Sequence, residues 1–193
     1  MKSTGEQYAS GAVVARELQL DPIVVRKDMA ITGVTGRPRL GFPVEELIVA
    51  IESFLGWTNT TDALLCGVGS LGRALLRYEG FKQHGLRIVA AFDTDPEKIN
   101  QRERGVQIFK LEKMPALIKR MHLQLGILTV PADAAQMVAE MMVESGIRGI
   151  WNFTPEKLVL PERIVIQRVD LASSLAVLSH RLYMQTPVVG KKV

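Results

Sequence analysis

The chain has 193 residues, a hydrophobic content of 47% and a charged content of 23%, which are ordinary values for a soluble globular protein of one large domain or two small ones. Its net charge of +4 is too small to indicate nucleic acid by itself. The apolar runs are too short to span a bilayer, the first residues have no signal-peptide core, and the single cysteine, Cys66, excludes an internal disulfide framework. We therefore expect a cytoplasmic protein in which Cys66 is buried in an apolar strand.

The first segment, residues 1–57, has the pattern of a winged helix-turn-helix domain. Ser10 precedes a first helical run. Asp21 is a typical N-cap residue and Pro22 fits a first helical position, so a second short helix is expected over Ile23–Ala30.

A basic hairpin is expected after this second helix. The stretch Thr32–Phe42 holds three glycines and a proline between β-favouring residues, as tight hairpins do. In the second helix Val24 and Val25 should face inward. The bases gather on the helix and the hairpin tip: Arg26, Lys27, Arg37 and Arg39. Such local clustering indicates contact with a DNA backbone. The alternative to DNA binding is that this segment is a small helical cap whose arginines contact only solvent.

A third, amphipathic helix is expected over Val44–Leu55, and it carries three of the seven acidic side chains of this segment. The polar stretch that follows it, Gly56–Thr61, predicts a linker. We therefore expect a winged-helix domain at 1–57, a nucleotide-binding domain at 58–169, and a terminal helix with its tail at 170–193.

The central motif of the chain is a glycine-rich turn between a strand and a helix. The apolar run Ala63–Cys66 predicts a buried strand, Gly67, Gly69 and Gly72 form G-x-G-x-x-G, and Ser70–Tyr78 has helical periodicity. In such a motif the glycines allow a tight turn, close approach to a pyrophosphate, and close packing of helix on strand. The helix N-terminus then offers N–H groups to the phosphates.

An acidic residue completes this motif. Asp93 ends a second apolar strand, Arg87–Phe92, about twenty residues after Gly72, where a carboxylate can bond both ribose hydroxyls of an adenosine. No arginine lies in 94–98 to accept a 2′-phosphate, which favours NAD(H) over NADP(H). The alternative is a glycine-rich turn that binds nothing, with Asp93 as a helix cap.

The rest of the chain alternates between strands and helices, which predicts a parallel, doubly wound sheet. Strands are expected at 106–109, 125–130, 147–153 and 164–166, and helices at 95–98, 114–122 and 132–144. Ligand should lie at the carboxyl ends of the strands, beside the glycine turn, Asp93, Thr129–Pro131 and Asn152–Thr154.

A final helix, Asp170–Gln185, carries a stripe of leucines at Leu171, Leu175, Leu178 and Leu182. Either the stripe packs on the chain's own sheet or it binds a partner subunit. No substrate domain follows the sheet, the histidines (His84, His122, His180) lie away from the strand ends, and no pair of them has metal-ligand spacing. These features favour a sensor over an enzyme. We expect no bound metal.

The sequence resembles the Rex family of bacterial redox-sensing transcriptional repressors over nearly its whole length. The matching stretches are Val25–Asp28, Gly33–Phe42, Val44–Ile48, Gly67–Ala74, Val89–Ile99, Leu128–Ala132, Ala134–Gln136, Gly146–Ile150, Asn152–Phe153 and Val169–Leu171. The resemblance implies a homodimer with winged-helix and Rossmann domains that binds operator DNA and is released by NADH. The leucine stripe of the terminal helix separately leads us to expect that two subunits exchange this helix to form the dimer.

The resemblance also assigns residues. Arg26 and Lys27 would lie on the recognition helix, Arg37 and Arg39 in the wing, and Tyr78 with Asp170 would form a pair linked to the redox switch. The cofactor set expected from motif and resemblance is Gly67, Val68, Gly69, Ser70, Leu71, Gly72, Tyr78, Asp93, Thr129, Val130, Pro131, Asn152 and Asp170.

This sequence departs from the family pattern at its N-terminal end. The family usually has a further helix there, with an arginine of the switch, and here no arginine precedes Arg16. The segment after the recognition helix, Ala30–Gly33, and the wing, Arg37–Gly41, also differ from the family's usual residues. Two other functions are compatible with the residues: an NAD-dependent oxidoreductase and a coenzyme A-binding Rossmann subunit.

Overall fold

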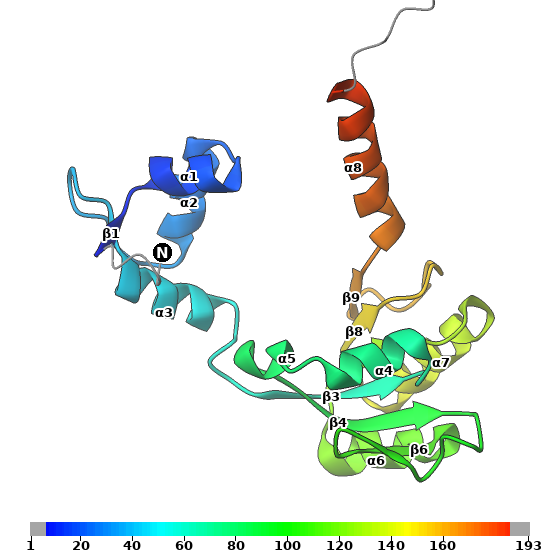
Figure 1. Cartoon of the computed structure of the whole chain (residues 1–193). Helices are drawn as coiled ribbons and strands as arrows, with labels where there is room; N and C mark the ends of the chain where they lie inside the picture. The colour runs from blue at the N-terminus through cyan, green and yellow to red at the C-terminus, as the bar shows by residue number, and fades with distance from the viewer. Residues whose placement is uncertain (1–6, 186–193) are drawn as a thin grey trace, which may run out of the picture. The chain divides into compact units, whose positions relative to one another are not determined.

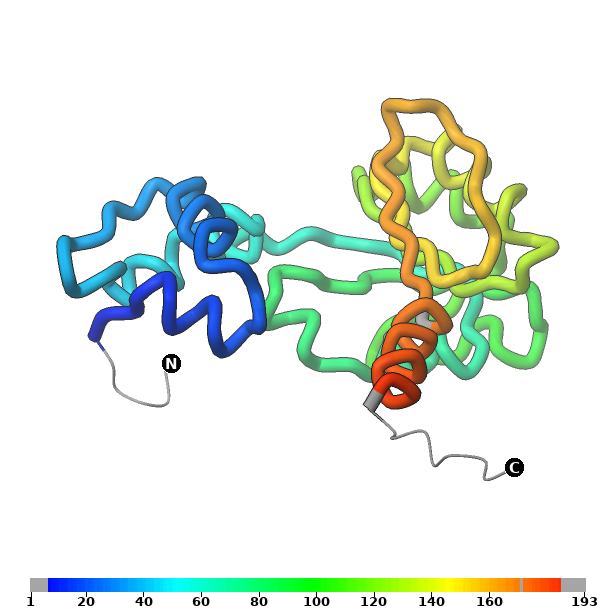
Figure 2. The backbone as a smooth tube through the Cα atoms, turned by 90° about the horizontal axis from the view of Figure 1, so that it is seen from above, coloured from blue at the N-terminus to red at the C-terminus, as the bar shows by residue number. Residues whose placement is uncertain are grey.

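The structure, a computed structural model, describes residues 7–185, except for the side chains of Leu171 and Gln185. Its contacts divide the chain into two compact units. One comprises Met1–Thr60 with Glu79–Leu86, and the other comprises Thr61–Tyr78 with Arg87–Val193. The chain therefore leaves the first unit, returns to it, and leaves it again (Figure 2).

Three helices make up most of the first unit: α1 (Gly11–Leu18), α2 (Pro22–Ile31) and α3 (Val44–Phe54). The predicted N-cap at Asp21 is confirmed, and Ser10 also acts as an N-cap. The Ser10 hydroxyl accepts the Val13 N–H at 3.2 Å, and the Asp21 carboxylate accepts the Ile23 N–H at 2.6 Å. Each cap satisfies a helix N–H that has no partner inside the helix. The small core of this unit contains Ala15, Val25, Met29 and Leu47.

The inward face of α2 differs from the prediction at one residue. Val25 and Met29, four residues apart, are buried, whereas Val24 is 47% exposed. Adjacent residues of a helix differ by about 100° in direction, so Val24 points to the side of α2 when Val25 faces the core.

The wing has an unexpected strand partner. Its strand β2 (Phe42–Pro43) pairs antiparallel with β1 (Tyr8–Ala9), not with the stretch that follows α2. The tip is a tight turn in which Arg37 and Gly41 exchange backbone hydrogen bonds of 2.7 and 3.0 Å. Gly41 has φ +100°, and a Cβ there would lie 2.4 Å from the Ala9 carbonyl oxygen, so the position requires glycine.

The second unit contains a seven-stranded sheet. Its strands are β3 (Thr61–Cys66), β4 (Leu86–Asp93), β5 (Arg102–Glu103), β6 (Val106–Lys110), β7 (Leu125–Leu128), β8 (Gly149–Asn152) and β9 (Val165–Arg168). Their order is β5-β6-β4-β3-β7-β8-β9. The β4–β6, β3–β7, β7–β8 and β8–β9 pairs are parallel, and β5–β6 is antiparallel. The strand order reverses beside β3, which places a binding crevice at the carboxyl ends of β3 and its neighbours.

Helices cover this sheet (Figure 1). They are α4 (Ser70–Arg77), the short η1 (Leu111–Lys113), α6 (Met114–Met121) and α7 (Ala132–Ser145); the short α5 (Gly80–Gln83) belongs to the first unit. The core between sheet and helices includes Leu64, Phe92, Ile118, Leu128 and Met142, none more than 1% exposed. Cys66 is a free cysteine in this core, as predicted, and burial raises the pKa of its thiol far above the ordinary value.

The segment after β4 is a series of turns instead of the predicted helix at 95–98. The Asp95 carboxylate accepts the Glu97 N–H at 2.9 Å, which starts the turn as a cap would. Asn100 then adopts φ +66°, a left-handed conformation that ends any helical run.

The last described element, α8 (Leu171–Gln185), does not pack on the chain's own sheet. Every described side chain from Ala172 to Met184 is exposed, including Leu175, Leu178 and Leu182 of the predicted stripe. Figure 1 shows α8 as a single rod that follows β9. Of the two interpretations of the stripe, packing on its own sheet is therefore wrong.

Within residues 7–185, no helix has the length and apolarity needed to cross a membrane. The same residues contain no group of three or more histidine, cysteine or acidic side chains that could hold a metal ion.

Candidate functional site

The glycine turn of the second unit has the geometry that close approach of a ligand requires. Gly67 has φ +95°, and a Cβ on it would lie 2.6 Å from the Thr129 carbonyl oxygen. A Cβ on Gly72 would lie 2.0 Å from the Gly67 carbonyl oxygen, so α4 can approach the turn only with glycine there. By contrast, a Cβ on Gly69 would meet nothing within 4 Å, which leaves open space over the turn. The turn, the close packing of the helix and the open space over Gly69 are thus the backbone geometry expected of this motif.

The N-terminus of α4 faces this open space with unused hydrogen-bond donors. Its first helical hydrogen bond runs from the Arg73 N–H to the Gly69 carbonyl at 2.9 Å, and Gly69 has no side chain to cap the helix. The N–H groups of Ser70, Leu71 and Gly72 therefore stand outside the helical ladder. Together with the positive end of the helix dipole, they can bind a pyrophosphate.

Thr129 holds the turn in place from the neighbouring strand. Its hydroxyl lies 2.9 Å from the Cys66 carbonyl oxygen and 2.8 Å from that of Gly67, and its N–H donates to the Cys66 carbonyl at 2.9 Å. The end of β3 is thereby fixed to the residue that follows β7.

Asp93 stands at the end of β4, as predicted, and is anchored from three sides. One carboxylate oxygen accepts the Val68 N–H at 2.7 Å, and the other accepts the Asp95 N–H at 2.9 Å. The Lys98 ammonium lies 3.2 Å from Asp93 and 3.3 Å from the carboxylate of Asp95. Two carboxylates thus share one ammonium, and the cluster keeps a net negative charge.

The pKa of Asp93 reflects these contacts. Burial alone raises it, because a charged carboxylate loses water. The backbone N–H groups of Asp95 and Val68, followed by the Lys98 ammonium, outweigh this effect and bring the pKa below its ordinary value. Asp93 is therefore held as an anion whose remaining lone pairs can accept hydroxyl groups.

A cleft of about 530 Å³ joins these parts. It is lined by the predicted residues Gly67, Gly69, Asp93, Thr129, Val130 and Pro131, together with Phe92, Thr94, Asp95, Lys98, Leu111, Ala134, Met137 and Val138. The glycine turn and Asp93 contribute polar groups to the lining, and α7 contributes the apolar side chains of Ala134, Met137 and Val138. This combination suits a nucleotide, whose phosphates and ribose are polar and whose base has two apolar faces.

Other predicted cofactor residues do not line this cleft. Val68 is buried and contributes only its N–H to Asp93. Asn152 is 1% exposed, and its side chain is used within its own loop. Its amide donates to the Glu156 carbonyl at 3.0 Å, and its carbonyl oxygen accepts the Thr154 N–H at 2.8 Å. Asn152 therefore shapes the loop after β8.

Tyr78 and Asp170, the expected switch pair, also lie outside the lining of the cleft. Tyr78 follows α4 and is 57% exposed. Asp170 precedes α8, accepts the Ser173 N–H at 3.1 Å and lies 3.7 Å from the guanidinium of Arg168. The hydrogen bonds from Ser173, and then the charge of Arg168, lower the pKa of Asp170.

The four predicted DNA-contacting bases are all exposed on the first unit. The stem of Arg26 packs over α1, where a Cβ on Gly11 would lie 2.8 Å from its Cγ. The Arg37 guanidinium lies 5.4 Å from the centre of the Tyr8 ring, a cation–π distance. Arg39 lies at the wing tip with φ +67°.

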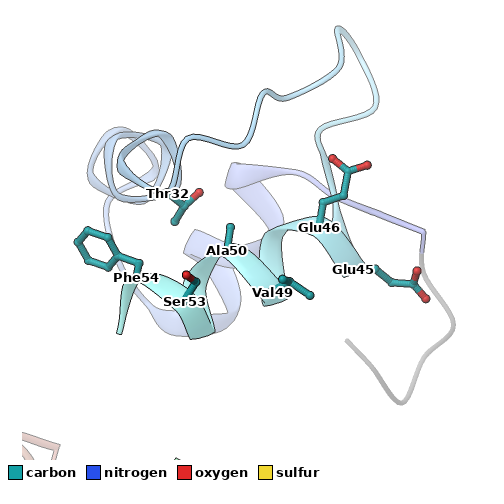
Figure 3. A pocket seen from close by; sticks show the side chains of 7 residues that line it. All are labelled: Thr32, Glu45, Glu46, Val49, Ala50, Ser53 and Phe54. Carbon is teal, nitrogen blue, oxygen red and sulfur yellow. The ribbon is translucent and has the colours of Figure 1, made fainter. Parts of the chain in front are cut away.

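A hollow with two glutamates in its lining lies on α3 of the first unit. It is lined by Thr32, Glu45, Glu46, Val49, Ala50, Ser53 and Phe54 (Figure 3). Figure 3 shows Glu45 and Glu46 toward one end of the helix and Phe54 at the other. Carboxylates repel phosphates, so a DNA backbone is expected to meet α2 and the wing instead.

Comparison with known proteins gives matches over residues 58–156 and over most of the chain. Residues 58–156 match the family model of the CoA binding domain. A redox-sensing transcriptional repressor Rex from Treponema denticola is 46% identical over 89% of this chain and 82% of its own length.

Solved structures of RSP, a Rex-family repressor, are also similar. RSP in complex with β-NAD⁺ and operator DNA has a TM-score of 0.87 at 29% identity, covering 95% of this chain and 85% of RSP. RSP in complex with β-NADH has a TM-score of 0.85 at 30% identity, covering 93% and 84%.

Proposed function

This chain belongs to the Rex family of redox-sensing transcriptional repressors, with residues 58–156 in the CoA binding domain family, and from that premise we propose how its two units work. The first unit binds operator DNA through α2 and the wing. The cleft of the second unit binds NAD(H), and NADH binding releases the protein from DNA. Such a protein acts where the chromosome lies, in the cytoplasm, and needs no catalytic turnover.

The observation that carries the cofactor assignment is Asp93 at the edge of the cleft. Its carboxylate, held as an anion, can accept the two free ribose hydroxyls of the adenosine in NAD(H). NADP(H) carries a phosphate on the 2′ position and coenzyme A carries one on the 3′ position. Either phosphate would meet the net negative cluster of Asp93, Asp95 and Lys98.

The match to the CoA binding domain makes coenzyme A the second candidate ligand, and the unused donors at the α4 N-terminus would serve its pyrophosphate equally well. Calorimetric titration of the purified protein with NADH, NAD⁺, NADPH and coenzyme A separates the candidates. We expect binding of the first two ligands only. Tight binding of coenzyme A without NADH binding would replace the cofactor assignment.

The repressor assignment is tested by selecting DNA from a random-sequence pool with the full-length protein, with and without NADH. We expect a two-fold symmetric site to be enriched without NADH and lost with it, because symmetric sites reflect symmetric dimers. Incubation with NADH and small carbonyl substrates tests the oxidoreductase alternative, and sustained NADH oxidation would favour it.

We also propose that α8 forms the dimer. Its exposed apolar stripe, Leu175, Leu178 and Leu182, is not covered by the described part of the chain. Exchange of identical terminal helices between two copies is a low-cost way to cover such a stripe. Asp170, at the start of α8, would then connect the dimer contact to the cofactor site.

A further inference from the structure

The exposed face of α2 is unexpectedly apolar. Ile23 and Ile31 are each 62% exposed, and Lys27 lies between them. These residues are spaced four apart, so they form one stripe along the side of α2 opposite to the buried Val25 and Met29. An isoleucine contributes nothing to a phosphate contact. If α2 binds DNA, the two isoleucines of this stripe must contact something other than phosphate.

The N-terminal end of α2 is the end that can reach base edges. In helix-turn-helix proteins, the first residues of the recognition helix contact bases in the major groove. Ile23 lies in the first turn of α2, directly after Pro22, and its N–H is bound to the capping Asp21 at 2.6 Å. The backbone that carries Ile23 is thus fixed, and its side chain projects away from the core.

The bases of DNA present only one methyl group on their major-groove edges. Thymine presents a C5-methyl group there, whereas the other edges present hydrogen-bond donors and acceptors. A buried apolar contact with this methyl group is what an isoleucine side chain can provide. Lys27, four residues further along the same face, supplies the positive charge that the groove's phosphates favour.

We propose that Ile23 reads a thymine methyl group in each half of the operator. The inference rests on the proposed function, since it requires that α2 is the recognition helix. It adds an apolar readout by Ile23 to the polar contacts of Arg26 and Lys27, and it names the base that the first turn of α2 prefers.

The test begins with the DNA site selected by the full-length protein. Each thymine in it is replaced singly by deoxyuridine, which keeps base pairing and removes only the methyl group, and affinity is measured by competition anisotropy. We expect one thymine per half-site at which the replacement weakens binding by about fourfold, the affinity equivalent of burying one methyl group. Replacement in both half-sites should weaken binding by about fifteenfold if the two contacts are independent.

The same comparison in variants identifies the reading residue. For Ile23→Ala, the affinity for the thymine site divided by the affinity for the deoxyuridine site should fall close to one at that position. Ile23→Thr, which keeps the branched shape, should reduce it less. Val49→Ala provides the matched control, because Val49 is also 62% exposed but lines the hollow on α3. It should keep the full ratio.

Two results would overturn the inference while leaving the repressor function intact. In one, no thymine of the selected site is sensitive to loss of its methyl group. In the other, a thymine is sensitive and Ile23→Ala leaves that sensitivity unchanged. Failure to select any DNA would instead overturn the proposed function and the inference with it.

Discussion

Asp93 combines two properties that determine which dinucleotide the cleft accepts: it is held ionised, and it lies at the cleft edge. Asp93→Ala should weaken NADH binding by about 1–3 kcal/mol, the range for losing charge-assisted hydrogen bonds to the ribose. Calorimetric titration measures this loss. Asp62→Ala is the control, because Asp62 pairs with Arg87 at 2.7 Å outside the cleft lining. Equal binding of NADPH and NADH by the unmodified protein would contradict the role of Asp93.

The same carboxylate should make stability depend on pH. The pKa of Asp93 in the folded chain lies below its ordinary value of 3.8. Its ionised form is therefore favoured by folding above that value, and this contribution is lost as the pH falls through the folded pKa. Asp93→Asn should lower the free energy of unfolding at neutral pH, and the difference from the unmodified protein should shrink as the solution is acidified. Urea denaturation at a series of pH values measures it; a constant difference would contradict the prediction.

At this scale, the sequence predicts residues that follow one another closely. Gly67, Gly69, Gly72 and Asp93 belong to one strand–turn–helix–strand unit, so their spacing fixes their geometry. The contact of Lys98 with Asp93 was not predicted, because a helix was expected over 95–98. The observed turn instead brings the Lys98 ammonium to 3.2 Å from the Asp93 carboxylate. Asn152 was assigned to the cofactor from its place at a strand end, while its contacts are set by the loop that follows.

Among the elements, the wing offers the clearest test of DNA contact. Arg37→Ala with Arg39→Ala should lower affinity for all DNA sequences and flatten the dependence of affinity on salt, by about one unit of log–log slope for each lost phosphate contact. Anisotropy titrations over a range of salt concentrations measure both effects. Lys157→Ala, an exposed base of the second unit, should change neither. A changed sequence preference with an unchanged salt slope would mean that the wing reads bases instead.

The elements themselves were predictable to different degrees. The helices α1, α2, α3 and α7 follow from caps and apolar periodicity, which are local. The two-residue strands β1 and β2 carry no such signal, because a pair this short is defined by its partner. Gly41, which lets β2 approach Ala9, is recognisable as necessary only once the pairing is known.

For the molecule as a whole, α8 should decide whether it is a dimer. Truncation after Val169 removes the apolar stripe and should give a monomer or an aggregate that no longer binds a symmetric DNA site. Light scattering coupled to size exclusion measures the mass. A chain that ends at Gln185 is the control and should remain a dimer. If the shorter chain also stays a dimer, another surface forms the interface.

Communication between cofactor and DNA can be tested at the start of the same helix. A cofactor shifts a conformational equilibrium only through contacts that differ between the two states. We expect Asp170→Ala to bind NADH normally and to show a weakened DNA response to NADH, since Asp170 lies outside the cleft lining. Arg168→Ala tests whether the ion pair at 3.7 Å contributes. An unchanged NADH response in both variants would exclude this part of the helix from the signal.

The return of the chain to its first unit limits how such proteins can be recombined. Glu79–Leu86 belongs with Met1–Thr60, and in it the His84 ring lies 4.2 Å from the ring of Trp57. Gly85, with φ +67°, approaches the same stretch so closely that a Cβ would lie 2.4 Å from the Asn59 carbonyl oxygen. A fragment cut at Thr60 would lose these contacts. A chimera that joins the DNA specificity of one relative to the ligand response of another therefore needs three junctions, near residues 60, 78 and 86.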